Sequence, residues 1–374
     1  MEKYQPPRHE VTKAHSCCGA LCLCVFVLIA IHLWPAHAYT VLYERQSRYH
    51  YIRVIESGNV RTMTFRRKGF DRNQSSMDMS DPLRPCLPYY PLMFSGYLFV
   101  PEPRRILVVG LGAGVLSRWS AHYFPEATVE SIELDPDVVD VAKKFFGFEE
   151  TERQRVFTRD ARVQIKVFQA QPEKYDIIML DAFRGGYVPF HLTTKEFFEE
   201  CRNILSPEGA FVVNLKPGWV IYQYQRRTLA SVFPEQYPFG GASGDEVVVA
   251  LPPVAQASRL HRAKEDLLAA ARRLQEERKF SFDLAEVVFQ FNSGPGFPAK
   301  GLVFTDGHVP ANILRQQMEN PLGEYRPPQP PLARLAAWLR AYRLPVILSA
   351  LVLIALAGVS WRRRRSSSCG GSRG

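Results

Sequence analysis

Cysteine is scarce in the part of the chain where it would shape a fold. Of the seven cysteines, four stand in one apolar N-terminal stretch and one lies in the C-terminal tail, which leaves Cys86 and Cys201 in the body. No Cys-x-x-Cys pair with a second pair downstream is present. We therefore predict neither a zinc site nor a disulfide scaffold, and we expect no bound metal.

The chain also lacks the composition of a disordered or repetitive protein. It has 374 residues, of which 46% are hydrophobic and 22% charged, and it shows no internal repeat. A chain of this composition can bury a substantial core. At about 150 residues per domain, it forms one large or two modest domains.

The net charge of +10 would suit a nucleic-acid binder, but its distribution argues against that function. Five arginines lie in the basic tail, residues 362–374, directly after an apolar run. In residues 257–279, basic side chains alternate with Glu and Asp, as on an ordinary solvated helix face. We therefore expect no nucleic-acid partner.

Long apolar runs are confined to the two ends of the chain. Within residues 1–38, the uncharged stretch 17–36 fits either a cleavable signal peptide or a transmembrane segment. Residues 344–361 are uncharged and are followed by four arginines, which predicts a transmembrane helix. A proline-rich linker, residues 316–343, precedes this helix. These features predict a membrane location, and they leave open which side holds the body.

The body divides into two parts by its hydrophobic pattern. In residues 39–100, two alternating runs flank Ser57-Gly58-Asn59, which predicts a β-hairpin within a small β-domain. In residues 101–315, buried strands alternate with helices, which is typical of an α/β fold with a parallel sheet covered on both faces. Strands are expected at 106–109, 128–133, 155–158, 175–180 and 210–214, and helices at 116–123, 137–146 and 195–205.

A glycine-rich turn follows the first strand of the α/β part. Gly110, Gly112 and Gly114 alternate with Leu111 and Ala113 just before the first helix. Glycines let the backbone turn sharply and approach a ligand, and the helix N-terminus offers free N–H groups. No lysine follows, as a phosphate-binding loop requires, and the third glycine comes too early for a dinucleotide site.

Acidic residues stand at the ends of the next three strands. Glu133 comes about twenty residues after the turn, where a carboxylate can accept both hydroxyls of a ribose. Asp160, followed by Ala161, comes after the third strand, where its side chain can accept from an adenine amino group. Asp181 ends the fourth strand, at the sheet edge where open α/β sheets bind ligands. The alternatives are that Glu133 is a solvated loop carboxylate and that Asp181 caps its loop.

Several motifs along the body occur together in one family. They are Glu44-x-x-Ser47-x-Tyr49-His50-x-Ile52-x-Val54, Tyr90-x-x-Met93, Thr194-x-x-Phe197-Phe198 and Thr305-Asp306-Gly307-His308-x-Pro310. With them, the chain resembles the spermidine synthase-like family, and the last motif is similar to the ending of its membrane-associated bacterial members. The resemblance implies a Rossmann-like, S-adenosylmethionine methyltransferase-type fold behind a small N-terminal β-domain.

The resemblance also implies a site and a co-substrate. Asp181 would be the catalytic residue, taking a proton from the acceptor. S-adenosylmethionine or its decarboxylated form would be the co-substrate, with no metal. The residues that would bind it are Gln74, Gly110, Gly112, Gly114, Glu133, Asp160, Ala161 and Pro189.

The acceptor half of the site departs from the family's pattern. Ala113, Pro91 and Arg184 stand where the family carries an acidic residue, a His or Gln, and a second Asp, and His50 replaces a Gln near the nucleoside. A polyamine is a multiply charged cation that needs opposing carboxylates. The polyamine acceptor is therefore one of two alternatives. The other is an acidic acceptor, drawn by Arg184 and more weakly by Lys216.

These observations lead to two hypotheses of different classes. The first is a membrane-anchored transferase that moves an aminopropyl or methyl group to a small-molecule acceptor, with a homodimer as its possible assembly. The second is a catalytically silent nucleoside-binding scaffold that retains the same fold.

Overall fold

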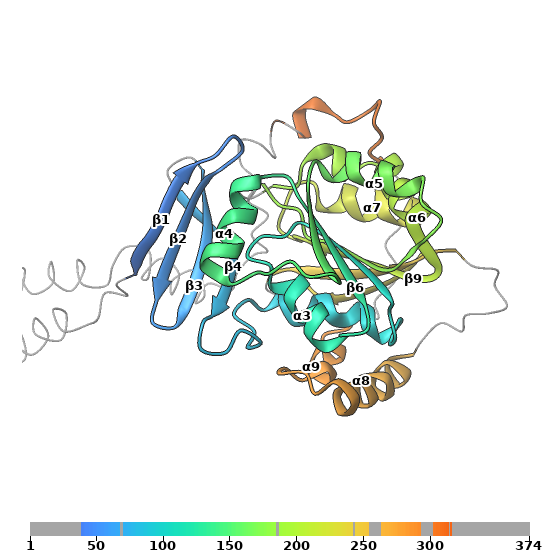
Figure 1. The fold of residues 1–374 in the computed structure, drawn as a ribbon. Helices are drawn as coiled ribbons and strands as arrows, with labels where there is room; N and C mark the ends of the chain where they lie inside the picture. Colours follow the sequence, from blue (N-terminus) through green and yellow to red (C-terminus); the bar gives the residue numbers. More distant parts are fainter. Residues whose placement is uncertain are drawn as a thin grey trace, which may run out of the picture. The chain divides into compact units, whose positions relative to one another are not determined.

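The computed structural model describes residues 39–67, 70–184, 187–241, 244–253, 263–292, 302–313 and 315, which all fall within one compact unit (Figure 1). The hydrophobic segments expected within residues 1–38 and at 344–361 lie outside the described residues, as do the linker and the basic tail. The domain boundaries given above remain predictions.

A four-stranded antiparallel sheet opens the unit, in the order β1-β2-β3-β4. The expected hairpin is confirmed, since β2 and β3 pair along their length and Gly58 takes a φ of +58° in the turn between them. Alternation buries Ile52, Val54 and Met63 on one face of this sheet. The strands are β1 (Thr40–Gln46), β2 (Tyr51–Ser57), β3 (Val60–Arg67) and β4 (Phe70–Asp78).

A second sheet of seven strands has the order β10-β11-β9-β8-β5-β6-β7. The strands from β9 to β7 pair in parallel, as expected, but β11 is antiparallel to both of its neighbours. The loop between β10 and β11 is too short for a crossover, so these two strands form a hairpin. The strands are β5 (Arg105–Val109), β6 (Thr128–Glu133), β7 (Gln154–Thr158), β8 (Tyr175–Leu180), β9 (Leu205–Leu215), β10 (Glu235–Gly240) and β11 (Glu246–Leu251).

Helices cover both faces of the seven-stranded sheet. The α-helices are α2 (Tyr89–Met93), α3 (Val115–Tyr123), α4 (Pro136–Phe146), α5 (Ala161–Gln169), α6 (Lys195–Ile204), α7 (Tyr222–Val232), α8 (Lys264–Arg278) and α9 (Leu284–Phe289). Two short 3-10 helices are η1 (Phe94–Leu98) and η2 (Phe190–Leu192). In Figure 1, α5, α6 and α7 gather on one side of the sheet, and α3, α8 and α9 lie on the other.

The two faces of β5 contribute to two separate hydrophobic cores. Ile106 and Val108 pack with the side of α3 and α8 and with the N-terminal sheet. Leu107 and Val109 point the other way and pack with α5, α6 and α7. A strand buried on both faces explains why residues 105–109 are a continuous apolar run after the first arginine.

The order of the strands creates a switch point between β5 and β8. The chain builds outward from β5 through β6 to β7, and then returns to β8 on the other side of β5. The loops after β5 and β8 therefore diverge, and a crevice opens where they part. Gly110 and Asp181 are the first residues of these two loops, and the Asp181 N–H donates to the Val109 carbonyl at 2.9 Å.

For the part of the chain that the structure describes, the predicted membrane location is corrected. Among the helices of the described ranges, none is long and apolar enough to cross a bilayer. The longest, α8, has 15 residues and carries charged side chains along most of its length. These helices bury an apolar stripe against the sheet instead.

Candidate functional site

A pocket of about 380 Å³ opens at the switch point. Its floor comes from the loops after β5, β6, β7 and β8, and Gln74 and Ser75 of β4 form part of its wall. Aromatic rings of Tyr89 and Phe183 line one end. A volume of this size suits a small organic ligand.

Two glycines bring the backbone close to the pocket. Gly110 has a φ of +100°, and a Cβ there would lie 2.5 Å from the Asp181 carbonyl oxygen. Gly112 has a φ of +55°, and its Cβ would collide with the Ser75 hydroxyl. Gly114 differs, because it starts α3 with a φ of +77° and faces the ring of Phe148. Gly110 and Gly112 line the pocket, whereas Gly114 shapes the helix start.

Glu133 is held against the glycine turn. Its Oε2 accepts from the N–H groups of Leu111 at 3.1 Å and Gly112 at 3.5 Å, and its Oε1 accepts from the Asp135 N–H at 3.1 Å. Burial raises the pKa of Glu133, and these three N–H groups partly oppose that rise. The side chain is therefore a half-buried carboxylate whose orientation is fixed on the pocket wall.

Asp160 lies between a helix start and a loop. Its Oδ1 accepts from the N–H groups of Arg162 and Val163, which caps α5. Its Oδ2 lies 2.9 Å from His191 Nε2, and this bond, more than any other cause, lowers the pKa of Asp160. Asp160 and the adjacent Ala161 line the pocket. They thus bring the α5 N-terminus and the η2 segment together at one edge.

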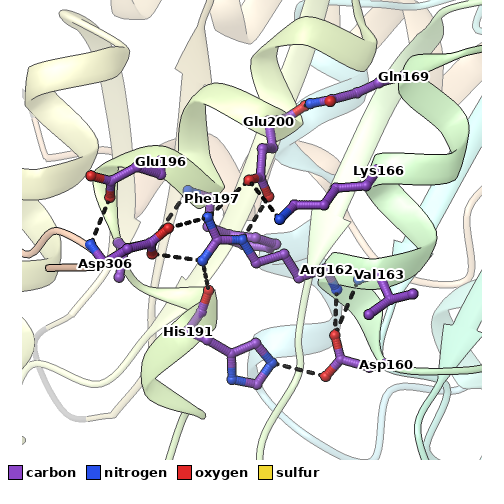
Figure 2. A network of polar contacts seen from close by, with 11 residues as sticks. Asp160, Arg162, Val163, Lys166, Gln169, His191, Glu196, Phe197, Glu200 and Asp306 are labelled. Atoms are coloured by element: carbon purple, nitrogen blue, oxygen red, sulfur yellow. Dashed lines mark hydrogen bonds and ion pairs between the residues drawn. The ribbon is translucent and has the colours of Figure 1, made fainter.

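Behind Asp160, Arg162 anchors three segments (Figure 2). Its guanidinium donates to both carboxylate oxygens of Glu200 in α6, at 2.7 and 2.8 Å, and to both of Asp306, at 2.6 Å each. It also donates to the His191 carbonyl at 3.4 Å. Thr194 donates to Asp306 at 2.8 Å. The C-terminal segment 302–313 is thereby fastened behind the pocket edge.

Asp181 is a carboxylate of the pocket that two side chains hold in place. Its Oδ2 accepts from the Tyr89 hydroxyl and its Oδ1 from Asn214 Nδ2, both at 2.9 Å. Burial raises its pKa to about 6, although the two donors and nearby Lys216 each lower it. A carboxylate with this pKa is ionised at neutral pH and can take up a proton.

Two further charged residues meet on the far side of Asp181. Lys216 follows β9 directly, and its ammonium pairs with the carboxylate of Asp245, which precedes β11. The Lys216 Nζ also lies 5.6 Å from the ring centre of Tyr89 and 5.3 Å from that of Phe183. Burial lowers the pKa of Lys216, and Asp181 opposes that shift.

A basic residue and an imidazole form another part of the wall. His50 stacks on Phe65 with ring centres 4.0 Å apart. Burial, followed by the charge of Arg184, lowers the pKa of His50 to about 4, so the ring is neutral at neutral pH. The Arg184 guanidinium lies 5.9 Å from the ring centre of Tyr49. Arg184 thus lines the pocket with an aromatic neighbour.

Most of the residues expected at the site do line one pocket. They are Gln74, Gly110, Gly112, Glu133, Asp160, Ala161, Asp181 and Pro189. Pro189 precedes η2, and Gln74 donates from Nε2 to the Arg72 and Asn73 carbonyls at 3.0 and 3.1 Å. Over the described part of the chain, no group of three or more His, Cys, Asp or Glu side chains could hold a metal ion.

The sequence reasoning missed three polar residues of the pocket. Tyr89 and Asn214 contact Asp181, and Asp245 contacts Lys216. Asn214 lies near the carboxyl end of β9, and Asp181 follows the carboxyl end of the parallel strand β8. The position of Asn214 at this sheet edge could therefore have identified it from the sequence. Asp245 gave no such signal, because it comes from the loop of an antiparallel hairpin.

Comparison with known proteins places the chain in a family. The model of the spermine/spermidine synthase domain matches residues 91–239. A polyamine aminopropyltransferase of Vibrio vulnificus is 33% identical over 280 residues, which cover 74% of this chain and 92% of that protein. This chain belongs to the spermidine synthase family. Its ancestry makes it a transferase, as the resemblance implied.

Other relatives of this spermidine synthase family member agree with that conclusion. A polyamine aminopropyltransferase of Chromobacterium violaceum is 34% identical over 183 residues, which cover 49% of this chain and 68% of that protein. The crystal structure of a probable spermidine synthase from Corynebacterium glutamicum has a TM-score of 0.52 at 18% identity, covering 72% of this chain and all of that one. The latter supports the fold alone.

Proposed function

We propose that this transferase moves an aminopropyl group from decarboxylated S-adenosylmethionine to a primary amine of a polyamine-type acceptor. The observation that carries the proposal is Asp181, a half-buried carboxylate at the switch point with a pKa of about 6, in the same pocket as Glu133. The relatives matched over most of their length are named polyamine aminopropyltransferases, which favours aminopropyl over methyl transfer.

The reaction needs little from the protein beyond orientation and one base. The nitrogen lone pair of the acceptor attacks the propyl carbon bonded to the sulfonium. The new C–N bond forms as the C–S bond breaks, and methylthioadenosine leaves as a neutral thioether. The lone pair is available only on the neutral amine, so Asp181 takes up the proton that the acceptor's ammonium loses before the attack, and the product nitrogen keeps the positive charge. Tyr89 and Asn214 fix the carboxylate for that transfer.

We assign the nucleoside half of the pocket to the other acidic residues. Glu133 faces the turn and would accept the ribose hydroxyls, while Asp160, beside Ala161, would accept the adenine amino group. Gln74 from β4 and Pro189 before η2 would enclose the nucleoside, and the close backbone at Gly110 and Gly112 makes room for it. Their common location on one pocket supports this assignment.

The test replaces the proposed base by its neutral isostere. In Asp181→Asn, the single amide oxygen can still accept from one of the two donors, Tyr89 or Asn214, but the amide cannot take up a proton. We expect kcat to fall by about a hundredfold or more. Release of methylthioadenosine and the aminopropylated amine would both be quantified, with decarboxylated S-adenosylmethionine and diaminobutane as substrates. Asp140→Asn, an exposed change on α4, is the matched control.

The stability of Asp181→Asn separates a catalytic loss from misfolding. The folded pKa of Asp181 is raised above its unfolded value of about 4, so ionisation costs folding free energy above about pH 6 and none below about pH 4. The variant loses that cost together with one hydrogen bond, worth about 1 kcal/mol, so its stability at neutral pH should stay close to that of the wild type. A variant that keeps normal turnover would refute the assignment of Asp181 as the base.

The silent scaffold remains the alternative to this function. The observation that favours it is the set of departures at Ala113, Pro91 and Arg184, which remove polar groups that the family uses for the acceptor. Binding of methylthioadenosine, with no transfer to any amine tried, would support the scaffold. The possible homodimer and the absence of a nucleic-acid partner remain predictions.

A further inference from the structure

The side chains around Lys216 are of the kind that binds the ammonium group of a ligand. The carboxylate of Asp245 pairs with the Lys216 Nζ, and the faces of Tyr89 and Phe183 lie within 6 Å. Carboxylates and aromatic faces are the groups that bind organic ammonium ions. The Lys216 side chain is 28% exposed and that of Asp245 is 17% exposed, so the pair is largely withdrawn from water.

This ammonium site lies beside the proposed base. Asp181 and Lys216 interact electrostatically, and the Tyr89 ring below Lys216 belongs to the residue whose hydroxyl contacts Asp181. If the reacting nitrogen of the acceptor lies at Asp181, the opposite end of the acceptor would lie near Lys216 and Asp245. In a diamine, that far end carries a second ammonium.

We propose that Lys216 is a specificity-determining residue whose ammonium occupies the place of the acceptor's second ammonium. The proposal rests on the function proposed above. Asp245 is already neutralised by Lys216, so a second ammonium must displace the lysine or remain without a carboxylate. The wild-type pocket therefore discriminates weakly between a diamine and a monoamine of the same length.

A positive charge on another part of the pocket wall also disfavours binding of a second ammonium. Arg184 lines that part, where its guanidinium lies 5.9 Å from the ring centre of Tyr49 and its charge contributes to lowering the pKa of His50. A second ammonium directed toward Arg184 would be repelled. Lys216 also attracts an acidic acceptor only weakly, because Asp245 already balances its charge.

The experiment compares the binding of two amines by calorimetric titration. Diaminobutane and butylamine have the same carbon chain and differ by one amino group. Each is titrated into the full protein saturated with methylthioadenosine. In the wild type we expect dissociation constants within about threefold of each other, a difference of about 0.7 kcal/mol or less.

The decisive variant is Lys216→Met, which keeps the side-chain length and removes the charge. It frees Asp245 and the two aromatic faces, so diaminobutane is expected to bind about tenfold more tightly while butylamine is unchanged. Adding Asp245→Asn to this variant should abolish the gain. Lys195→Met, on the exposed face of α6, is the matched control. Lys216→Gln serves in the same role if the methionine variant does not fold.

Two results would overturn the inference. One is a wild type that already binds diaminobutane more than tenfold better than butylamine. The other is a Lys216 variant that gains nothing or gains equally for both amines. These titrations need no turnover, so they decide the role of Lys216 separately. If methylthioadenosine is never released with either amine, the proposed function fails instead.

Discussion

The chemistry of the pocket depends on how single side chains are solvated. Asp181 and Glu133 are both half-buried on the pocket wall, and burial raises the pKa of each, yet their donors differ. Glu133 accepts only from backbone N–H groups, which cannot be moved without moving the turn. Asp181 accepts from two side chains, Tyr89 and Asn214. Its proton affinity can therefore be changed by substitution without disturbing the fold.

Tyr89→Phe tests that dependence. The hydroxyl of Tyr89 lowers the pKa of Asp181, so its removal raises that pKa further above 6. Because the base must be ionised, kcat/KM in the wild type falls about tenfold per pH unit below about pH 6. In the variant we expect the midpoint of the kcat/KM profile to move to higher pH by about one pH unit.

The pH profile of kcat/KM measures this shift. Tyr51→Phe removes a similar tyrosine–carboxylate bond, to Glu44 at the surface, and should leave the profile unchanged. A midpoint that stays in place in Tyr89→Phe, or moves to lower pH, would show that Asp181 is not the titrating group.

At the scale of elements, the pocket edge depends on how α5, α6 and the segment 302–313 are joined. Asp160 caps α5 and contacts His191 before α6, while Arg162 in the first turn of α5 holds Glu200 and Asp306. Loops that carry binding residues are otherwise the least stable parts of a domain. These contacts fix the position of the loop around Pro189.

Arg162→Met is the corresponding prediction. The arginine side chain is only 11% exposed, and its loss removes the cation that pairs with both Glu200 and Asp306, while the more exposed Lys166 stays 3.6 Å from Glu200. We expect the free energy of unfolding to fall by about 3 kcal/mol. Urea denaturation would measure it. Lys166→Met, on the same helix with a 59% exposed side chain near Glu200, should cost less than about 1 kcal/mol. Equal losses in the two variants would contradict the argument.

At the scale of the whole molecule, the pocket joins the N-terminal sheet to the larger one. The Ser75 hydroxyl of β4 accepts from the Ala113 N–H at 3.1 Å, and Ser47 donates to Asp135, which caps α4. A ligand held by Glu133 and Gln74 would bridge the same two sheets. Binding should therefore stabilise the complete unit rather than one part of it.

Thermal unfolding in the presence of methylthioadenosine checks this expectation. At a hundredfold excess over the dissociation constant, the ligand should add about 2.7 kcal/mol to the free energy of unfolding and raise Tm in a single transition. Glu133→Gln should abolish most of that rise, whereas the exposed change Glu152→Gln should keep it. A Glu133→Gln variant with an undiminished rise would remove Glu133 from the nucleoside site.

The sequence allowed prediction of the parallel part of this molecule better than the rest. Strand 175–180 is a compact apolar run and 128–133 is a short strand of mixed composition, and their carboxyl ends meet at one sheet edge, so Glu133 and Asp181 could be placed together. The β10–β11 hairpin was not predicted, although Val247-Val248-Val249 and the glycines before them are a local strand and turn signal. Its antiparallel place beside the parallel strands depends on tertiary packing. The position of Asp245 depends on that hairpin, so its ion pair with Lys216 was not predicted either.

The anchoring of Arg162 by Asp306 also bears on how the protein is made. The two residues are 144 positions apart, and the ribosome delivers the chain from its N-terminus. All strands of both sheets can pair before Asp306 has been synthesised. The edge of the nucleoside pocket near Asp160 is therefore the last part of the unit to mature, and a nascent chain can hold its sheets before it can hold its ligand.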